Sequence, residues 1–115
     1  MNDRRNLTID EAEEFASWFH CLADPTRVRI LHYVAGKSEP ITVGEIVEAV
    51  DRSQSTVSKH LQVLAADRFV FLETEGVRTL VTANEACMTA LPEAAAAIMG
   101  APTLPAPTPT RPAGS

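Results

Sequence analysis

The chain has 115 residues, of which 45% are apolar and 22% are charged, and its formal net charge is −5. This length and composition suit one ordinary globular domain with a single modest core. No apolar run is long enough to span a membrane, and the polar start lacks the apolar stretch of a secretory signal, so we expect a cytoplasmic protein that does not enter a membrane. The negative charge excludes indiscriminate binding to phosphate, because sequence-independent DNA binding relies on Lys and Arg.

Composition also predicts where the folded domain lies within the chain. Residues 101–115 hold most of the prolines and almost no large apolar residue, so we expect a disordered, proline-rich tail there. Residues 1–9 are expected to be a flexible N-terminus. The folded domain should therefore occupy residues 10–100.

Three helices in the first half of the domain are predicted by the residues that would cap them. Thr8 is followed three residues later by Glu11, and Thr42 by Glu45, which is the spacing of a capping box. Asp24 stands directly before a proline, a pair that is typical of a helix start. Behind each cap, apolar residues recur at helical spacing.

The second half predicts a polar-faced helix, a hairpin and a last helix. Ser53 is a good N-cap for a fourth helix, and residues 69–83 read as two strands of β-favouring residues around a polar turn. Asn84 should cap a last helix over residues 85–99, which Pro92 is expected to kink. The predicted fold is mainly α with one β-hairpin, in the order of a winged helix-turn-helix.

The outer face of the fourth helix consists of Ser, Thr, Gln, Lys and His side chains. A polar helix face is usually only solvated, but its place here, after a short helix and before a hairpin, favours DNA binding. Hydroxyl groups near a helix N-terminus suit phosphates, whereas amide and basic side chains suit base edges in the major groove. The hairpin would be the wing. The candidate DNA contacts are Gln54, Ser55, Thr56, Ser58, Lys59, His60, Gln62 and, near the tip of the wing, Arg78.

Two segments of the chain resemble the ArsR/SmtB family of repressors. FHCLADPTRVRIL is similar to the family's second-helix segment LADPTRLRIL, and QSTVSKHLQVL is similar to its recognition helix QSTVSHHLKVL. With a similar wing, the resemblance covers residues 12–99. It implies an effector-responsive repressor that dimerises through its first and last helices and presents two recognition helices to a pseudo-palindromic operator. The residues expected at this homodimer interface are Phe15, Trp18, Phe19, Leu22, Leu91 and Ile98.

The effector is not given by the resemblance, because two metal patterns of the family are missing. The third helix has no Cys-x-Cys pair, and the last helix has no histidine. Cys21, Cys87 and His20 are the remaining candidate ligands for nickel, zinc or another transition metal, and the two cysteines are also candidate redox thiols. The more ordinary interpretation is that both cysteines are free thiols buried as small apolar side chains.

Other classes of function stay open at this stage. The missing metal patterns suggest a DNA-binding subunit that relies on a separate partner protein for sensing. The acidic balance suggests a winged-helix module that binds protein. An enzyme is not expected, since Gly-x-x-x-x-Gly-Lys, Gly-x-Ser-x-Gly and His-Glu-x-x-His motifs are absent and so small a domain leaves little room for a substrate pocket.

Overall fold

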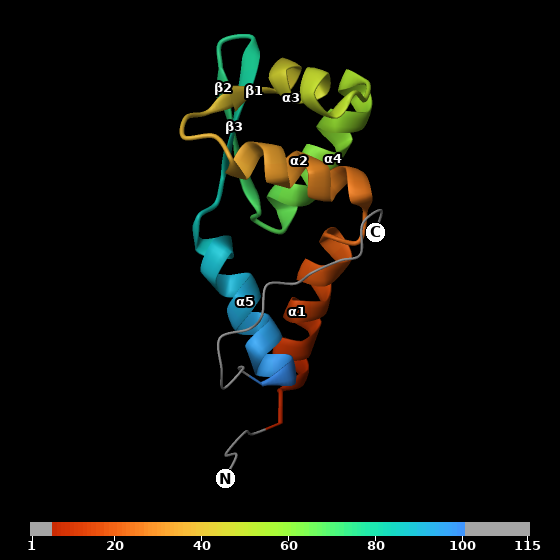
Figure 1. The fold of residues 1–115 in the computed structure, drawn as a ribbon, viewed down its shortest axis with the longest axis vertical. Coiled ribbons are helices and arrows are strands. Elements are labelled where there is room, and N and C mark those ends of the chain that lie inside the picture. Colours follow the sequence, from red (N-terminus) through yellow and green to blue (C-terminus); the bar gives the residue numbers. More distant parts are fainter. Residues whose placement is uncertain (1–5, 101–115) are drawn as a thin grey trace, which may run out of the picture.

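The computed structural model describes residues 6–100, except for the side chain of Met88, and contains the elements in the predicted order. The expected tail over 101–115 lies outside the described residues. Figure 1 shows α2, α3, α4 and the strands gathered together, with α1 and α5 extending away from them. The elements are α1 (Ile9–Cys21), α2 (Pro25–Ala35), β1 (Ile41–Thr42), α3 (Val43–Val50), α4 (Gln54–Ala66), β2 (Val70–Glu75), β3 (Arg78–Ala83) and α5 (Ala86–Met99).

Thr8, Asp24, Thr42 and Ser53 cap their helices as predicted. Asn84 does not: the N-cap of α5 is Glu85, which makes no side-chain capping bond, and Asn84 Oδ1 accepts from the N–H of Ala86, the first residue of the helix. In each capping box the threonine hydroxyl accepts a hydrogen bond from the glutamate N–H, at 3.1 Å for Thr8 and Glu11 and at 3.2 Å for Thr42 and Glu45. Each glutamate carboxylate in turn accepts from its threonine N–H at 3.0 Å. The Ser53 hydroxyl caps α4. These bonds satisfy backbone N–H groups that would otherwise lack a partner in the first turn, so they fix where the helices begin.

The strands form a small antiparallel sheet in the order β1-β3-β2. Val81 on the central strand lies opposite both Ile41 and Leu72, and its side chain is buried. Gly76 turns the hairpin with a φ of 65°, a conformation that glycine adopts without steric cost. The sequence predicted the hairpin, and the structure adds β1, which joins the start of α3 to the sheet.

The core lies between α2, α3, α4 and the inner face of the sheet. By contrast, α1 and α5 contribute only Cys21 and Ala94 to the fully buried apolar residues of the described part of the chain. Pro92 lies inside α5, and the helix continues past it to Met99. Within residues 6–100 no helix combines the length and apolar character needed to cross a membrane. The largest buried side chains are Phe69, Ile30, Ile46, Leu61, Leu64, Val34, Val50, Val57, Val70 and Val81.

Candidate nucleic-acid interface

The helix α4 has one face in the core and the opposite face in solvent. Val57, Leu61 and Leu64 recur at helical spacing and are almost fully buried. This stripe anchors the helix, so the side chains on the other side are held in a fixed direction. Among the predicted DNA contacts on α4, Gln54, Ser55, Lys59 and Gln62 are exposed, whereas Thr56, Ser58 and His60 are half-buried.

Hydroxyl groups gather at the N-terminus of α4. Ser53 Oγ accepts from the N–H of Thr56 at 3.2 Å and donates to the Thr56 hydroxyl at 3.0 Å. The Ser55 hydroxyl lies 3.3 Å from Ser53 Oγ. The helix dipole places partial positive charge at this end, which suits a phosphate group. Arg52, exposed and next to the cap, is a cation that the sequence reasoning did not single out, although its place beside a helix start was visible.

His60 is turned toward α2 and not toward the exposed face of its own helix. Its Nδ1 lies 3.3 Å from Arg27 Nη1, and its Nε2 lies 4.0 Å from Asp24 Oδ1. The backbone N–H groups of Arg27 and Thr26 donate to Asp24 and lower the pKa of that carboxyl group. The sequence reasoning placed no functional role on Arg27, even though it lies in the segment that carries the family resemblance.

The wing has its cation at the tip, where the sequence placed it, but that cation is paired. Arg78 lies opposite Glu75 in the hairpin, and Arg78 Nη2 donates to Glu75 Oε1 at 3.0 Å. Both side chains are exposed, so water screens the pair and its contribution to stability is small. Val77, beside them in the turn, is fully exposed. The tip therefore presents an apolar side chain and an ion pair that a competing anion could open.

The residues predicted for a dimer interface are divided between the core and the surface. Trp18, Leu22 and Leu91 are half-buried against the core, and the Phe15 ring packs on Trp18 with 5.5 Å between ring centroids. Phe19 is 42% exposed and Ile98 is 41% exposed. The aromatic face of α1 is thus only partly covered by its own chain.

Both cysteines are free thiols, as expected, and each thiol donates to a backbone carbonyl group. Cys21 is buried and its Sγ donates to Val63 O at 3.8 Å, while Cys87 Sγ donates to Arg68 O at 3.2 Å. Burial, reinforced by the nearby Asp67 carboxylate, raises the pKa of Cys21 from 9.0 to about 11, and burial also raises the pKa of Cys87. His20 is exposed on α1. In the part of the chain that the structure describes, no three His, Cys, Asp or Glu side chains gather as metal ligands.

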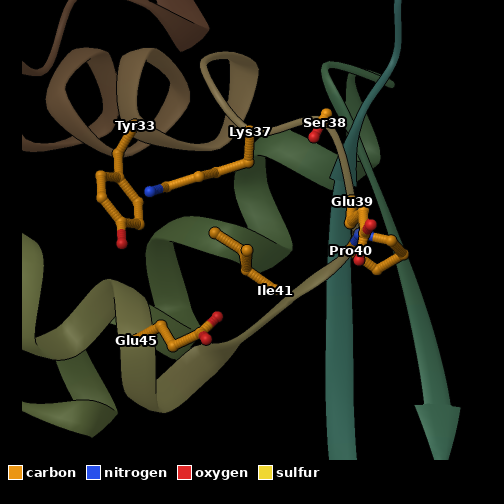
Figure 2. Close-up of a pocket in the computed structure, with 7 residues that line it drawn as sticks. All are labelled: Tyr33, Lys37, Ser38, Glu39, Pro40, Ile41 and Glu45. Carbon is orange, nitrogen blue, oxygen red and sulfur yellow. The ribbon is translucent and has the colours of Figure 1, made fainter.

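Several hollows lie outside the α4 face, and two of them bear on the candidate sites. The first, of about 330 Å³, lies between the end of α2 and the start of α3, and Figure 2 shows Lys37 extending toward Tyr33 across it. The Lys37 ammonium group stands 4.7 Å from the Tyr33 ring centroid, and Glu45 on the opposite wall is occupied as a helix cap. The second, of about 190 Å³, lies between α1 and α5 and is lined by Trp18, Leu91 and Cys87 among others. Neither hollow includes a predicted DNA contact.

Comparison with known proteins agrees with this arrangement. The family described as "Bacterial regulatory protein, arsR family" matches residues 24–70, which span α2 to the start of β2. A transcriptional repressor SmtB homolog of Synechocystis sp. is 33% identical over 64 residues, or 56% of this chain. The match covers 47% of that relative, so the chain spans about half the length of the curated protein it resembles.

Solved structures of similar fold extend the likeness beyond the matched segment. NolR from Sinorhizobium fredii has 28% identity and a TM-score of 0.63, over 85% of this chain and 99% of its own. The homodimeric winged helix-turn-helix DNA-binding domain of Mb0332 from Mycobacterium bovis has 25% identity and a TM-score of 0.63, over 84% of this chain and 90% of its own.

The matched family is described as one of bacterial regulatory proteins and the curated relative as a transcriptional repressor, and neither description names an enzyme. The fold is the winged helix-turn-helix that the order of elements predicted. Over residues 24–70 the chain therefore resembles the arsR family of bacterial regulatory proteins, and its described residues share the fold of NolR and of the Mb0332 domain.

Proposed function

We propose that this protein is a homodimeric transcriptional repressor that binds operator DNA with α4 in the major groove and the hairpin as a wing. The observation that carries the proposal is the exposed polar face of α4, which lies opposite the buried stripe and begins at the helix N-terminus. Ser55, with Thr56 and Ser58, contacts phosphates. Gln54, Lys59 and Gln62 reach base edges or phosphates in the groove.

The dimer is formed by α1 and α5. Apolar side chains on these helices remain exposed in one chain, including Phe19 and Ile98. The M. bovis domain of similar fold is homodimeric, which supports the same assembly here. A two-fold axis between the α1–α5 faces presents two copies of α4 to the two half-sites of a pseudo-palindromic operator.

Because the chain is acidic overall, its binding to DNA depends on the few positive charges near α4 and the wing. Lys59 and Arg52 are exposed on or beside α4, and Arg78 is exposed on the wing. Arg78 exchanges its bond with Glu75 for a phosphate oxygen when the complex forms. Because the whole chain carries a net charge of −5, binding depends on few cations and is selective for the correct DNA geometry.

An effector releases the repressor from DNA. Nickel or zinc held by Cys21, Cys87 and His20 is one hypothesis, and oxidation of the two thiols is another. Oxidation needs thiolate, and burial raises the pKa of Cys21 to about 11 and also raises that of Cys87, which leaves little thiolate at neutral pH. This observation favours a second candidate, in which the protein is a DNA-binding subunit and a separate partner protein senses the effector.

The test is a fluorescence anisotropy titration of the full chain with duplex DNA from upstream of its own gene, repeated over a range of salt concentrations. We expect specific binding that weakens steeply with salt, and we expect Lys59→Ala to lower the slope of log K against log salt by about 1. Lys37→Ala is the matched control, because Lys37 lies at the hollow in Figure 2, which no α4 residue lines. Binding that ignores salt would contradict the proposal and favour a protein-binding module.

The effector is tested on the same complex with zinc, nickel, a chelator and peroxide, using wild type and a Cys21→Ser, Cys87→Ser double variant. Release in wild type but not in the double variant would support a cysteine-based sensor. Equal behaviour of the two proteins under every treatment would support the separate sensing partner.

A further inference from the structure

We infer that His60 is a positioning residue, which together with Arg27 fixes the recognition helix α4 against the end of α1, and that it does not contact DNA. The inference rests on the proposed function of α4 as the DNA-reading helix. It replaces the expectation from the sequence that His60 reads a base or a phosphate.

Arg27 joins two elements through one guanidinium group. Its Nε donates to the carbonyl oxygen of Cys21, the last residue of α1, at 2.6 Å. Its Nη1 lies 3.3 Å from Nδ1 of His60 on α4. A guanidinium group only donates, so Nδ1 must accept and His60 carries its proton on Nε2. That nitrogen faces Asp24, which is itself held by the first turn of α2.

The side chain of His60 has little freedom to turn toward DNA. It is only 19% exposed, and both ring nitrogens already face groups of α2 or its N-cap. Lys59, the next residue, is exposed. Adjacent residues on a helix point about 100° apart, so the two side chains serve different surfaces.

Two further contacts link α1 to the C-terminal part of α4. Cys21 Sγ donates to Val63 O at 3.8 Å, and Ser17 Oγ donates to Asp67 Oδ1 at 3.0 Å. Val63 contributes its backbone carbonyl group and Asp67 is the C-cap of α4, so both contacts lie in the turns that follow His60. We call His60, Val63 and Asp67 together the α1-facing stripe of α4, because each is linked to α1, His60 through Arg27.

The α1-facing stripe gives α4 a fixed relation to the dimer helix. Ser17 and Cys21 on α1 are four residues apart, so they meet α4 one helical turn from each other. The carbonyl group that ends α1 is held through Arg27. Since α1 belongs to the proposed dimer interface, the distance between the two copies of α4 follows the packing of α1. His60 and Arg27 thereby set the half-site geometry without touching DNA.

The identity of the bonded ring nitrogen gives a sharp test by substitution. Asn places an acceptor oxygen near the position of Nδ1, whereas the longer Gln side chain places its oxygen nearer to Nε2. We expect His60→Asn to keep operator affinity within about twofold to threefold, and His60→Gln to lower it about tenfold, the effect of losing one charge-assisted hydrogen bond.

The salt dependence of binding separates positioning from contact. Both His60 variants should keep the wild-type slope of log K against log salt, whereas Lys59→Ala should reduce that slope by about 1. A reduced slope in either His60 variant, or equal loss of affinity in Asn and Gln variants, would overturn the inference.

A second measurement tests the link without DNA. In a double-mutant cycle of Arg27→Met and His60→Gln, urea unfolding of the full chain should show non-additive changes in the folding equilibrium constant, by a factor of about three or more. Additive changes would overturn the inference. If wild-type protein shows no salt-dependent DNA binding, the proposed function fails, while the cycle still decides whether Arg27 and His60 are coupled.

Discussion

The core formed by α2, α3, α4 and the sheet is complete within one chain, whereas the packing of α1 and α5 is not. We call the first region the body and the second the arm. The body holds almost all of the fully buried apolar residues, but the arm supplies only Cys21 and Ala94 among the residues described. Exposed large apolar side chains occur in both regions, namely Ile9, Phe19, Ile98 and Met99 in the arm and Val28, Val63, Phe71 and Val77 in the body, so the contrast between the regions lies in their buried residues.

This difference separates two sources of stability. The body buries its apolar stripes against each other, so its free energy of unfolding is a property of one chain. In the proposed dimer a second copy covers the remaining apolar surface of the arm, so we expect the stability of the arm to depend on protein concentration. The α1-facing stripe of α4 is the place where the two regions meet.

The largest expected effect comes from the body. Leu61 is 1% exposed, and Leu61→Ala leaves a cavity under α4 that should lower the free energy of unfolding by about 2–5 kcal/mol. Urea unfolding measures this change, with Gln62→Ala as the neighbouring exposed control. If the two variants lose equal stability, the description of the body as a core complete in one chain is wrong.

Features that depend on residues close together in the sequence could be predicted, whereas features that depend on residues far apart in the sequence could not. The capping boxes at Thr8 and Thr42 are contained within four residues, so their sequence pattern was sufficient to predict them. The strand β1 has two residues and exists because Ile41 pairs with Val81, forty positions later, which no local period reveals. In the same way, the exposed face of α4 was predicted from helical spacing, but the pairing of His60 with a residue on α2 was not.

A smaller effect, dependent on pH, comes from the contact between arm and body. Folding raises the pKa of the Cys21 thiol from 9.0 to about 11, so the native state binds the thiol proton more tightly than the unfolded chain does. Its stabilising contribution is complete below pH 9.0 and is lost as the pH rises toward about 11.

Unfolding measured at a series of pH values between 8 and 11 should therefore show this loss in wild type, and Cys21→Ala should flatten the profile. The readout is the slope with pH, because Ala also removes some packing. A variant profile as steep as that of wild type would assign the loss to other groups.

The next effect concerns the surface that the arm leaves open. Phe19→Ala should weaken dimerisation about tenfold, since an exposed aromatic residue at the centre of an interface contributes about 1–2 kcal/mol. Sedimentation of the protein over a range of concentrations measures the dissociation constant. Val77→Ala, which removes an exposed apolar side chain from the wing, is the matched control and should leave dimerisation unchanged. Equal dissociation constants for Phe19→Ala and wild type would remove Phe19 from the interface.

The smallest expected effect is that of removing a capping box, which can be compared between the body and the arm. Thr42→Ala removes the capping box of α3 in the body and should cost about 1 kcal/mol, whatever the protein concentration. Thr8→Ala removes the capping box of α1 in the arm, where the first turn can fray without opening the body. In dilute protein its loss of stability should therefore be smaller than that of Thr42→Ala. At concentrations that saturate the dimer, the two losses should become similar. Thermal unfolding at two protein concentrations measures both costs. The Thr→Ser variants keep the capping oxygen and should retain wild-type stability at either position. If the loss of stability in Thr8→Ala does not change with protein concentration, α1 is held by its own chain and not by a second copy.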